Sequence, residues 1–237
     1  MSPEFRQIRL NADENGVTNL DLKDLEGVAQ PTSPSWEEVF TSVLIPEEVN
    51  GLKILDVGAG ASDAVKRLSD LGADAYAIDP RYRSRSDLKG LVRKHNKVLE
   101  GEDSARREQA LESFMESIKN TPERYKTASA TDIPFTNDFF DIVYSRIAVT
   151  YYLDVDRDIF SKAVSECIRV TKPGGSIRFF PYREAEPAWP EIVNDLRLNN
   201  EYEIFDKISR DPNISSLKEV DVTIRGLPWK TLVLEKV

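Results

Sequence analysis

Two acidic residues and a glycine-rich turn form the pattern in this sequence with the clearest chemical meaning. The apolar run 53–57 contains Asp56 and leads directly into Gly58-Ala59-Gly60. A second apolar run, 75–78, ends at Asp79, 21 positions after the first glycine. Glycine has no side chain, so the backbone of such a turn can approach a ligand closely. A carboxylate after the second run can accept hydrogen bonds from both hydroxyls of a ribose. The pattern therefore predicts a site for a nucleotide-type cofactor.

The segments around the turn predict the elements that would position it. Residues at helical spacing follow the turn, namely Ala64, Val65, Leu68 and Leu71, and Gly72 is a natural stop for that helix. A strand–helix–strand unit of this length fits a right-handed crossover between parallel strands. Ligands of open α/β sheets bind outside the carboxyl ends of the strands, which is where the turn and Asp79 would lie.

The rest of the chain continues the alternation of strand and helix. We predict further strands at 125–130, 139–145, 176–180, 202–208 and 231–234, and helices at 36–44, 111–118, from 156 to about 168, and around 192–196. No clear helix separates the last two strands. The order indicates an α/β fold with a doubly wound, mostly parallel seven-stranded sheet and an antiparallel C-terminal edge strand.

Composition excludes several classes of function. The chain has 237 residues, a net charge of −9, one cysteine (Cys167) and one histidine (His95). Zinc sites of the usual His/Cys type are therefore close to excluded, and no metal is expected. The acidic charge argues against nucleic-acid binding. No run reaches the roughly 18 apolar residues of a membrane helix, and residues 1–10 carry no apolar signal core. We expect a cytoplasmic protein without a membrane partner.

Two acidic residues decide between cofactors. The dinucleotide fingerprint G-x-G-x-x-G requires a glycine where this chain has Asp63. An acid at the start of a helix is poorly placed to receive a pyrophosphate. Asp56, two positions before the first glycine, also points away from the dinucleotide fingerprint.

Four motifs together resemble those of the class I S-adenosylmethionine-dependent methyltransferases. They are Asp56-Val57-Gly58-Ala59-Gly60, Ala130-Thr131-Asp132-Ile133-Pro134-Phe135, Phe139-Phe140-Asp141-Ile142-Val143-Tyr144-Ser145 and Arg169-Val170-Thr171-Lys172-Pro173-Gly174-Gly175. They occur in the family's order and cover roughly residues 50–181. Each motif alone could be an ordinary turn or strand, and the resemblance depends on all four occurring together. The resemblance implies a Rossmann-like methyltransferase fold, S-adenosylmethionine as cofactor and S-adenosylhomocysteine as product.

The resemblance also implies which residues bind the cofactor. In the family, a carboxylate after the third strand meets the adenine amino group, and Asp132 matches that position. The expected cofactor-binding residues are Asp56, Gly58, Ala59, Gly60, Asp79, Pro80, Thr131, Asp132, Ile133 and Ser145. Two departures stand out. Ser62 replaces the family's third glycine and can cap the following helix. Tyr151-Tyr152 stand where the family often has a histidine pair, so we assign no catalytic residue.

The substrate side of the site rests on weaker patterns. Candidate substrate residues are Trp36, Arg146, Tyr151, Tyr182 and Arg183, because they follow strand ends or lie on a helix that commonly covers this site in the family. The aromatic residues could equally pack in the core, and the arginines could equally be solvated. The stretch 81–97 carries seven Lys or Arg residues and one Asp, a net charge of +6. It either attracts an anionic substrate or partner or is a solvated helix balanced by later acids.

These observations lead to a ranked set of functions. The first is transfer of a methyl group from S-adenosylmethionine to a small-molecule acceptor by in-line displacement. The second is a non-catalytic S-adenosylmethionine-binding protein with a regulatory or assembly role. The third is an NAD-type oxidoreductase, which Asp63 disfavours. Residues 1–237 are expected to form a single methyltransferase domain, with an N-terminal arm and lid helix at 1–50 and a charged helical insertion at 81–126.

Overall fold

A computed structural model of the chain describes residues 10–12, 18–20, 36–83, 112–151, 157–184, 208–224 and 227–237. The chain divides into two compact units, Met1–Thr32 and Ser33–Val237. The first unit contains a short antiparallel hairpin of β1 (Leu10–Ala12) and β2 (Thr18–Leu20). The organisation of the whole chain as one methyltransferase domain stays a prediction.

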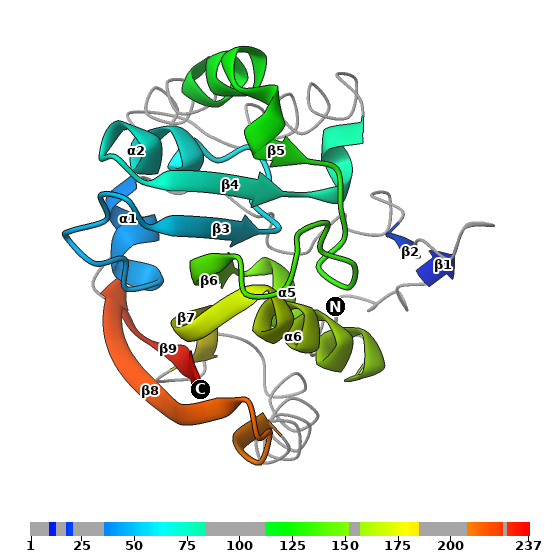
Figure 1. Ribbon diagram of the computed structural model, residues 1–237, viewed down its shortest axis with the longest axis vertical. Helices are drawn as coiled ribbons and strands as arrows, with labels where there is room; N and C mark the ends of the chain where they lie inside the picture. The colour runs from blue at the N-terminus through cyan, green and yellow to red at the C-terminus, as the bar shows by residue number, and fades with distance from the viewer. Residues whose placement is uncertain are drawn as a thin grey trace, which may run out of the picture. The chain divides into compact units, whose positions relative to one another are not determined.

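The second unit is built on a seven-stranded sheet with the order β5-β4-β3-β6-β7-β9-β8. Figure 1 shows these strands in sequence from β5 at the top to β8 at the bottom. The strands are β3 (Lys53–Val57), β4 (Asp74–Ile78), β5 (Tyr125–Lys126), β6 (Phe140–Arg146), β7 (Thr171–Glu184), β8 (Ile214–Ile224) and β9 (Leu227–Lys236). The chain moves outward from β3 through β4 to β5 and then returns to the other side of β3 with β6. The strand order therefore reverses at β3, the place where such sheets bind ligands.

The strand directions confirm the predicted fold class. Strand β3 pairs in parallel with β4 and β6, and β6 pairs in parallel with β7. Strand β9 is antiparallel to both of its neighbours, β7 and β8. The antiparallel strand is thus the last one in the chain, and it lies one place inside the sheet edge, which is formed by β8.

Helices cover both faces of the sheet because neighbouring strand residues point to opposite sides. In β3, Ile54 is buried in one core cluster and Leu55 in the other. The first cluster includes residues of α1 (Trp36–Ser42), α2 (Ala64–Asp70) and the helical residues 112–120. The second includes residues of α5 (Ala148–Tyr151) and α6 (Arg157–Val170).

The helix predicted from residue 156 is confirmed as α6. Its apolar residues fall on one face, and Phe160, Ala163 and Cys167 are fully buried there. Burial raises the pKa of the Cys167 thiol, and the charge of Glu166 acts in the same direction. Cys167 is therefore a small hydrophobic core residue.

Several element boundaries differ from the prediction. The third strand of the predicted order, β5, has only two residues, because the chain leaves the sheet after Lys126. Strand β7 begins at Thr171 instead of 176, and residues 172–175 fall at an irregularity in its pairing with β6. Strand β8 lies at 214–224, where no strand was predicted. Edge strands can carry many polar residues, so β8 has a weaker apolar signal than the segment before it.

Some predicted features lie outside the described residues. These are 84–97 of the basic stretch, the helix around 192–196 and all but the last residue of the strand at 202–208. Across the ranges described above, no helix has the length and apolar character needed to cross a membrane.

Candidate cofactor-binding site

The glycine turn joins the carboxyl ends of β3 and β4. The backbone N–H groups of Gly58 and Ala59 both donate to the carbonyl of Ile78, at 2.9 and 3.2 Å. Gly58 has a φ of +75° and Gly60 a φ of +59°, both in the left-handed region that favours glycine. A Cβ on Gly58 would lie 2.2 Å from the Cβ of Ala148 in α5. Both the backbone conformation and the close approach of α5 require glycine at this position.

Asp79 meets the turn directly, as the sequence predicted from its place after β4. Its side chain is buried, and its Oδ2 accepts a 2.9 Å hydrogen bond from the N–H of Gly60. The hydroxyl of Tyr82 donates to the carbonyl of the same glycine at 2.8 Å. Gly60 is therefore held on both sides of its backbone by the segment that follows β4.

Tyr82 is a site residue that the sequence analysis missed. Its ring packs against Phe114 and Tyr125, with ring centroids 6.0 and 5.7 Å apart. Desolvation by burial, together with the charges of Asp79 and Asp56, holds the pKa of Tyr82 well above its ordinary value. Tyr82 is therefore a neutral hydrogen-bond donor that connects the turn to the helical residues 112–120.

Arg81, two positions after Asp79 in the sequence, binds the same carboxylate. Its Nε donates to Oδ1 at 2.8 Å and its Nη2 donates to Oδ2 at 2.9 Å. Its backbone N–H also donates to Oδ1, at 2.9 Å. With the bond from Gly60, Asp79 accepts four hydrogen bonds from the described residues.

Asp56 lies buried behind the turn. Its Oδ2 accepts a 2.9 Å hydrogen bond from the hydroxyl of Tyr144 in β6. Burial raises the pKa of the Asp56 carboxyl from 3.8 to about 7, and the charge of Asp79 adds to this. The Tyr144 hydrogen bond and the charge of Arg146 oppose the increase. The site thus contains a carboxyl group that titrates near neutral pH.

The start of α2 explains why serine can replace a glycine in the turn. The Oγ of Ser62 accepts a 3.1 Å hydrogen bond from the N–H of Ala64, the first residue of the helix. The N-cap position of α2 is held by Asp63, whose side chain makes no capping hydrogen bond. The prediction that Ser62 caps the helix is therefore wrong, although Ser62 does bind the first helical N–H. Asp63 is buried, and its carboxylate accepts a 3.0 Å hydrogen bond from Nε of Arg67. Desolvation raises the pKa of Asp63, and its interactions with Arg67 oppose that increase.

Ser145 supports the turn from inside the protein. Its side chain is fully buried, and its hydroxyl donates to the carbonyl of Val57 at 2.9 Å. The same hydroxyl accepts a 3.0 Å hydrogen bond from the N–H of Val149 in α5. We infer that the Ser145 side chain positions the end of β3 relative to α5, and its predicted role as a direct cofactor ligand stays a prediction.

The loop after β5 is held in place by two residues of α6. Arg169 donates to the carbonyls of Ile133 and Phe135, each at 2.8 Å. Glu166 accepts a 2.8 Å hydrogen bond from the N–H of Ile133 and pairs with Arg169 at 2.7 Å. The Arg169 hydrogen bond lowers the pKa of Glu166. Arg169 and Glu166 together thus form a clamp on the backbone of residues 133–135. Asp132 itself is exposed, so the clamp leaves its carboxylate facing solvent.

The clamp leads to a first prediction. Arg169→Ala should lower the free energy of unfolding by about 2–3 kcal/mol, because two carbonyls and Glu166 lose a charged donor. The amide of Ile133 should also exchange faster with solvent. Arg169→Lys should restore little, since lysine keeps the charge but lacks the planar fork.

The measurements are urea denaturation and hydrogen exchange. Lys162→Ala, on the exposed side of the same helix, is the control. Equal exchange of Ile133 in the two alanine variants would contradict the clamp.

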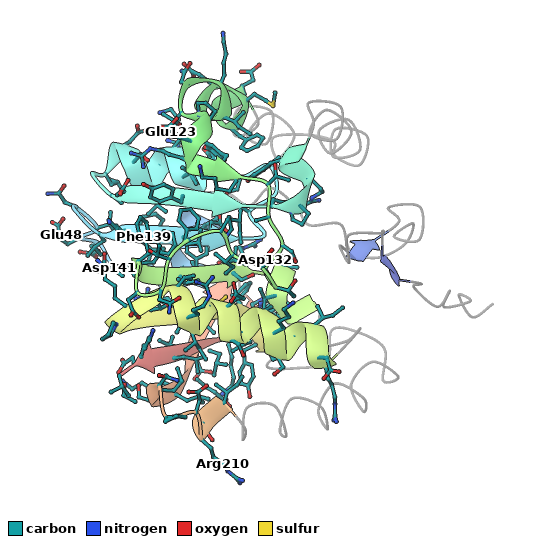
Figure 2. All side chains as sticks on the ribbon, turned by 45° about the vertical axis from the view of Figure 1, so that its right-hand side comes forward. Glu48, Glu123, Asp132, Phe139, Asp141 and Arg210 are labelled. Carbon is teal, nitrogen blue, oxygen red and sulfur yellow. The ribbon has the colours of Figure 1, made fainter. Side chains whose placement is uncertain are left out.

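Asp132 and Asp141 lie at opposite ends of the sheet, as Figure 2 shows. Asp141 accepts hydrogen bonds from the N–H of Lys53 at 2.8 Å and from Nζ of Lys172 at 2.7 Å. Its position at the amino ends of β3 and β6 gives it a structural role.

The candidate substrate residues are only partly described. Arg146 follows Ser145 at the carboxyl end of β6, and its guanidinium lies 5.6 Å from the ring centroid of Phe180. Tyr182 is buried in the core cluster of α5 and α6. The backbones of Trp36, Tyr151 and Arg183 belong to α1, α5 and β7, and their side chains lie outside the described part of the chain.

Within the described residues, no group of three or more His, Cys, Asp or Glu side chains could hold a metal ion.

The remaining predicted cofactor residues lie in the two segments that follow β4 and β5. Thr131 and Ser129 share a 2.9 Å hydrogen bond between their hydroxyls beside Asp132. Pro80 begins the short 3-10 helix η1 (Pro80–Arg83) that carries Arg81 and Tyr82. The predicted cofactor residues thus gather at the carboxyl ends of β3, β4, β5 and β6.

Comparison with known proteins identifies the family of this fold. Residues 55–179, more than half of the chain, match the family model described as a methyltransferase domain. The uncharacterised methyltransferase YcgJ of Bacillus subtilis (strain 168) is 26% identical over 145 residues, which cover 61% of this chain and 46% of that protein. The chain thus spans about half the length of this relative.

Two solved structures have similar folds. One is phosphoethanolamine N-methyltransferase 2 of Haemonchus contortus, in complex with phosphomonomethylethanolamine and S-adenosylhomocysteine. It is 15% identical with a TM-score of 0.53, over 86% of this chain and 53% of that one. The other is the PH0226 protein of Pyrococcus horikoshii OT3, 13% identical with a TM-score of 0.53, over 91% of this chain and 99% of that one. At these identities the likeness shows the fold alone. From the matched domain and the strand order together, we conclude that the chain belongs to the family of class I, S-adenosylmethionine-dependent methyltransferases.

Proposed function

We propose that this protein binds S-adenosylmethionine at the carboxyl ends of β3 and β4 and transfers its methyl group to a small-molecule acceptor. One observation supports this most directly. The glycine turn and the buried Asp79 form a single hydrogen-bonded unit at the point where the strand order reverses. Such a unit places a carboxylate beside a backbone that a ligand can approach closely.

The proposed contacts divide the cofactor among three segments. Asp79 binds the ribose hydroxyls, and the loop at 131–133 binds the adenine through Asp132. The turn at 58–60 lies against the methionine part, with Asp56 behind it. A sulfonium ligand has no phosphate, which fits the buried carboxylate of Asp63 at the start of α2. The same carboxylate disfavours an NAD-type oxidoreductase, whose pyrophosphate would lie there.

The proposed methyl transfer depends more on how the acceptor is oriented than on activation of the methyl group. The sulfonium methyl group is already reactive, and an acceptor held in line with the bond that breaks can gain roughly 7–11 kcal/mol from positioning. The acceptor's nucleophilic atom forms a bond to the methyl carbon, and the electron pair of the breaking bond returns to sulfur, giving S-adenosylhomocysteine. We assign no general base.

The acceptor is proposed to be a small molecule, with an anionic group as one option. Arg146 supports this, because it is the last residue of β6, at the ligand side of the sheet, and lies near an aromatic ring. A guanidinium in this arrangement is suited to a carboxylate or a phosphate. The chain's net charge of −9 opposes a nucleic-acid acceptor.

The proposal predicts the ligand preference of the purified protein. S-adenosylhomocysteine should bind in calorimetric titration and NADH should not. Asp79→Ala should weaken S-adenosylhomocysteine binding by about 100-fold, because two hydroxyl-to-carboxylate hydrogen bonds are lost. Asp74→Ala, at the opposite end of the same strand, is the matched control and should leave the affinity unchanged.

Other outcomes separate the alternatives. Tight NADH binding without S-adenosylhomocysteine binding would overturn the proposal. Cofactor binding without methyl transfer to any member of a broad acceptor panel would favour the regulatory or assembly role.

A further inference from the structure

The carboxylate of Asp79 has no acceptor position left for a ligand. A carboxylate offers about four lone-pair positions, two on each oxygen. On Oδ1 they are used by the backbone N–H and Nε of Arg81, and on Oδ2 by the N–H of Gly60 and Nη2 of Arg81. Only 2% of the Asp79 side chain is exposed.

The two kinds of donor differ in what they do for the carboxylate. The backbone N–H groups of Gly60 and Arg81 fix its orientation, one on each oxygen. The guanidinium occupies the remaining position on each oxygen with two parallel donors, Nε and Nη2. Removing the guanidinium alone would therefore free one position on each oxygen and leave the carboxylate oriented.

Two free positions on two neighbouring oxygens are what a ribose cis-diol requires. Its two hydroxyls are adjacent donors, like the two nitrogens of the guanidinium fork. We infer that the Arg81 side chain occupies the place of the cofactor's ribose diol, as an internal competitor that the cofactor must displace. The inference rests on the proposed function, since it takes Asp79 as the ribose-binding residue.

The position of Arg81 allows such a displacement. The residue lies in the short helix η1, and 26% of its side chain is exposed. Its Nη2 would lie only 3.3 Å from a Cβ placed on Gly60, so the guanidinium rests against the cofactor turn. Rotation of the side chain can move the guanidinium away while the backbone N–H of Arg81 keeps its own bond to Asp79.

The inference predicts that removing an arginine tightens cofactor binding. Arg81→Ala should bind S-adenosylhomocysteine about tenfold more tightly than the wild type, because the ligand no longer breaks a charged, bidentate contact. Arg124→Ala is a matched control, since Arg124 pairs with Asp74 at the other end of β4 and is also 26% exposed. Its affinity should equal that of the wild type.

A second measurement distinguishes competition from a general structural role. Methylguanidinium should compete with S-adenosylhomocysteine for binding to Arg81→Ala, because it can occupy the positions on the Asp79 carboxylate that the arginine side chain has left free. It should have no effect on binding to Arg124→Ala. If Arg81→Ala does not fold, Arg81→Gln serves in its place and should show a smaller gain in affinity.

The outcomes are separable. No S-adenosylhomocysteine binding to the wild type would refute the proposed function. Binding to the wild type with equal or weaker binding to both Arg81 variants would refute this inference alone.

Discussion

Replacing Gly58 with alanine is expected to destabilise the protein by about 2–5 kcal/mol and to abolish measurable binding of S-adenosylhomocysteine. Two causes add. The φ of +75° places an L-residue in the left-handed region, which costs about 1–2 kcal/mol. The new Cβ would also lie 2.2 Å from the Cβ of Ala148, far inside contact distance. Either the turn or α5 must move, and both border the proposed cofactor site.

The chain contains a control that separates these two causes. Gly51 has a φ of +76°, and a Cβ placed on it would meet nothing within 4 Å. Gly51→Ala should therefore show only the backbone cost, about 1–2 kcal/mol, with cofactor affinity unchanged.

A compensating change tests the steric cause itself. In the Gly58→Ala background, Ala148→Gly removes the atom that the new Cβ would strike. The double variant should recover part of the stability and of the S-adenosylhomocysteine affinity, although Ala148→Gly alone costs about 1 kcal/mol in helix propensity. Urea denaturation and calorimetry of all four proteins complete the cycle. Additive effects of the two substitutions would show that close packing of α5 is not what requires glycine.

The second large effect is a pH dependence of stability set by Asp56. The carboxyl has a pKa of about 7 in the folded protein and an ordinary value of 3.8, mainly because it is buried. Between these values the folded protein keeps a proton that the unfolded chain has lost. The free energy of unfolding should therefore fall as pH rises from about 4 to about 7, by up to about 4 kcal/mol in total.

Asp56→Asn should remove this dependence. Asparagine is neutral at every pH, and its carbonyl can accept the hydrogen bond that Tyr144 gives Asp56. The difference in unfolding free energy between the variant and the wild type should therefore grow in favour of the variant by about 2–3 kcal/mol as the pH rises from 5 to 8. Urea denaturation at a series of pH values measures the difference.

Asp141 provides a contrast of opposite sign. Burial alone would raise its pKa, but the hydrogen bonds from Lys172 and the backbone of Lys53 outweigh this and lower it. Its stabilising contribution is present above its ordinary pKa and is lost as pH falls through the lowered value. Asp141→Asn should thus cost most at neutral pH and least in acid. A parallel pH response of the two variants would contradict the assignment to Asp56.

The central part of the site could be predicted because it follows from local patterns. A buried strand, an acidic residue and a glycine turn are adjacent in the sequence, and parallel strands bring their carboxyl ends to one edge. These patterns are enough to place Gly58, Gly60 and Asp79 together. The hydrogen bond between Ser62 and Ala64 is predictable for the same reason, since the two residues are two positions apart.

The supporting contacts could not be predicted, because they join segments far apart in the chain. Tyr144 and Asp56 are separated by 88 positions, and Arg169 and Ile133 by 36. Tyrosine and arginine in a strand and a helix are ordinary residues until the register places them opposite a partner. Arg81 escapes prediction for a related reason. In the sequence, Arg81 is the first residue of the basic stretch 81–97. In the structure, its guanidinium instead binds Asp79, two positions before it.

The last two strands are joined to the sheet in the reverse of the order in which a ribosome makes them. Strand β8 is synthesised before β9, yet β9 lies between β8 and β7 and supplies the described pairing partner of β8. While β9 is unfinished, β8 lacks this partner, and β7 exposes the edge that β9 will later cover. Unpaired strand edges are sites of aggregation. Strand β7 therefore keeps an open edge until residues 227–236 have been made and β9 has paired with it.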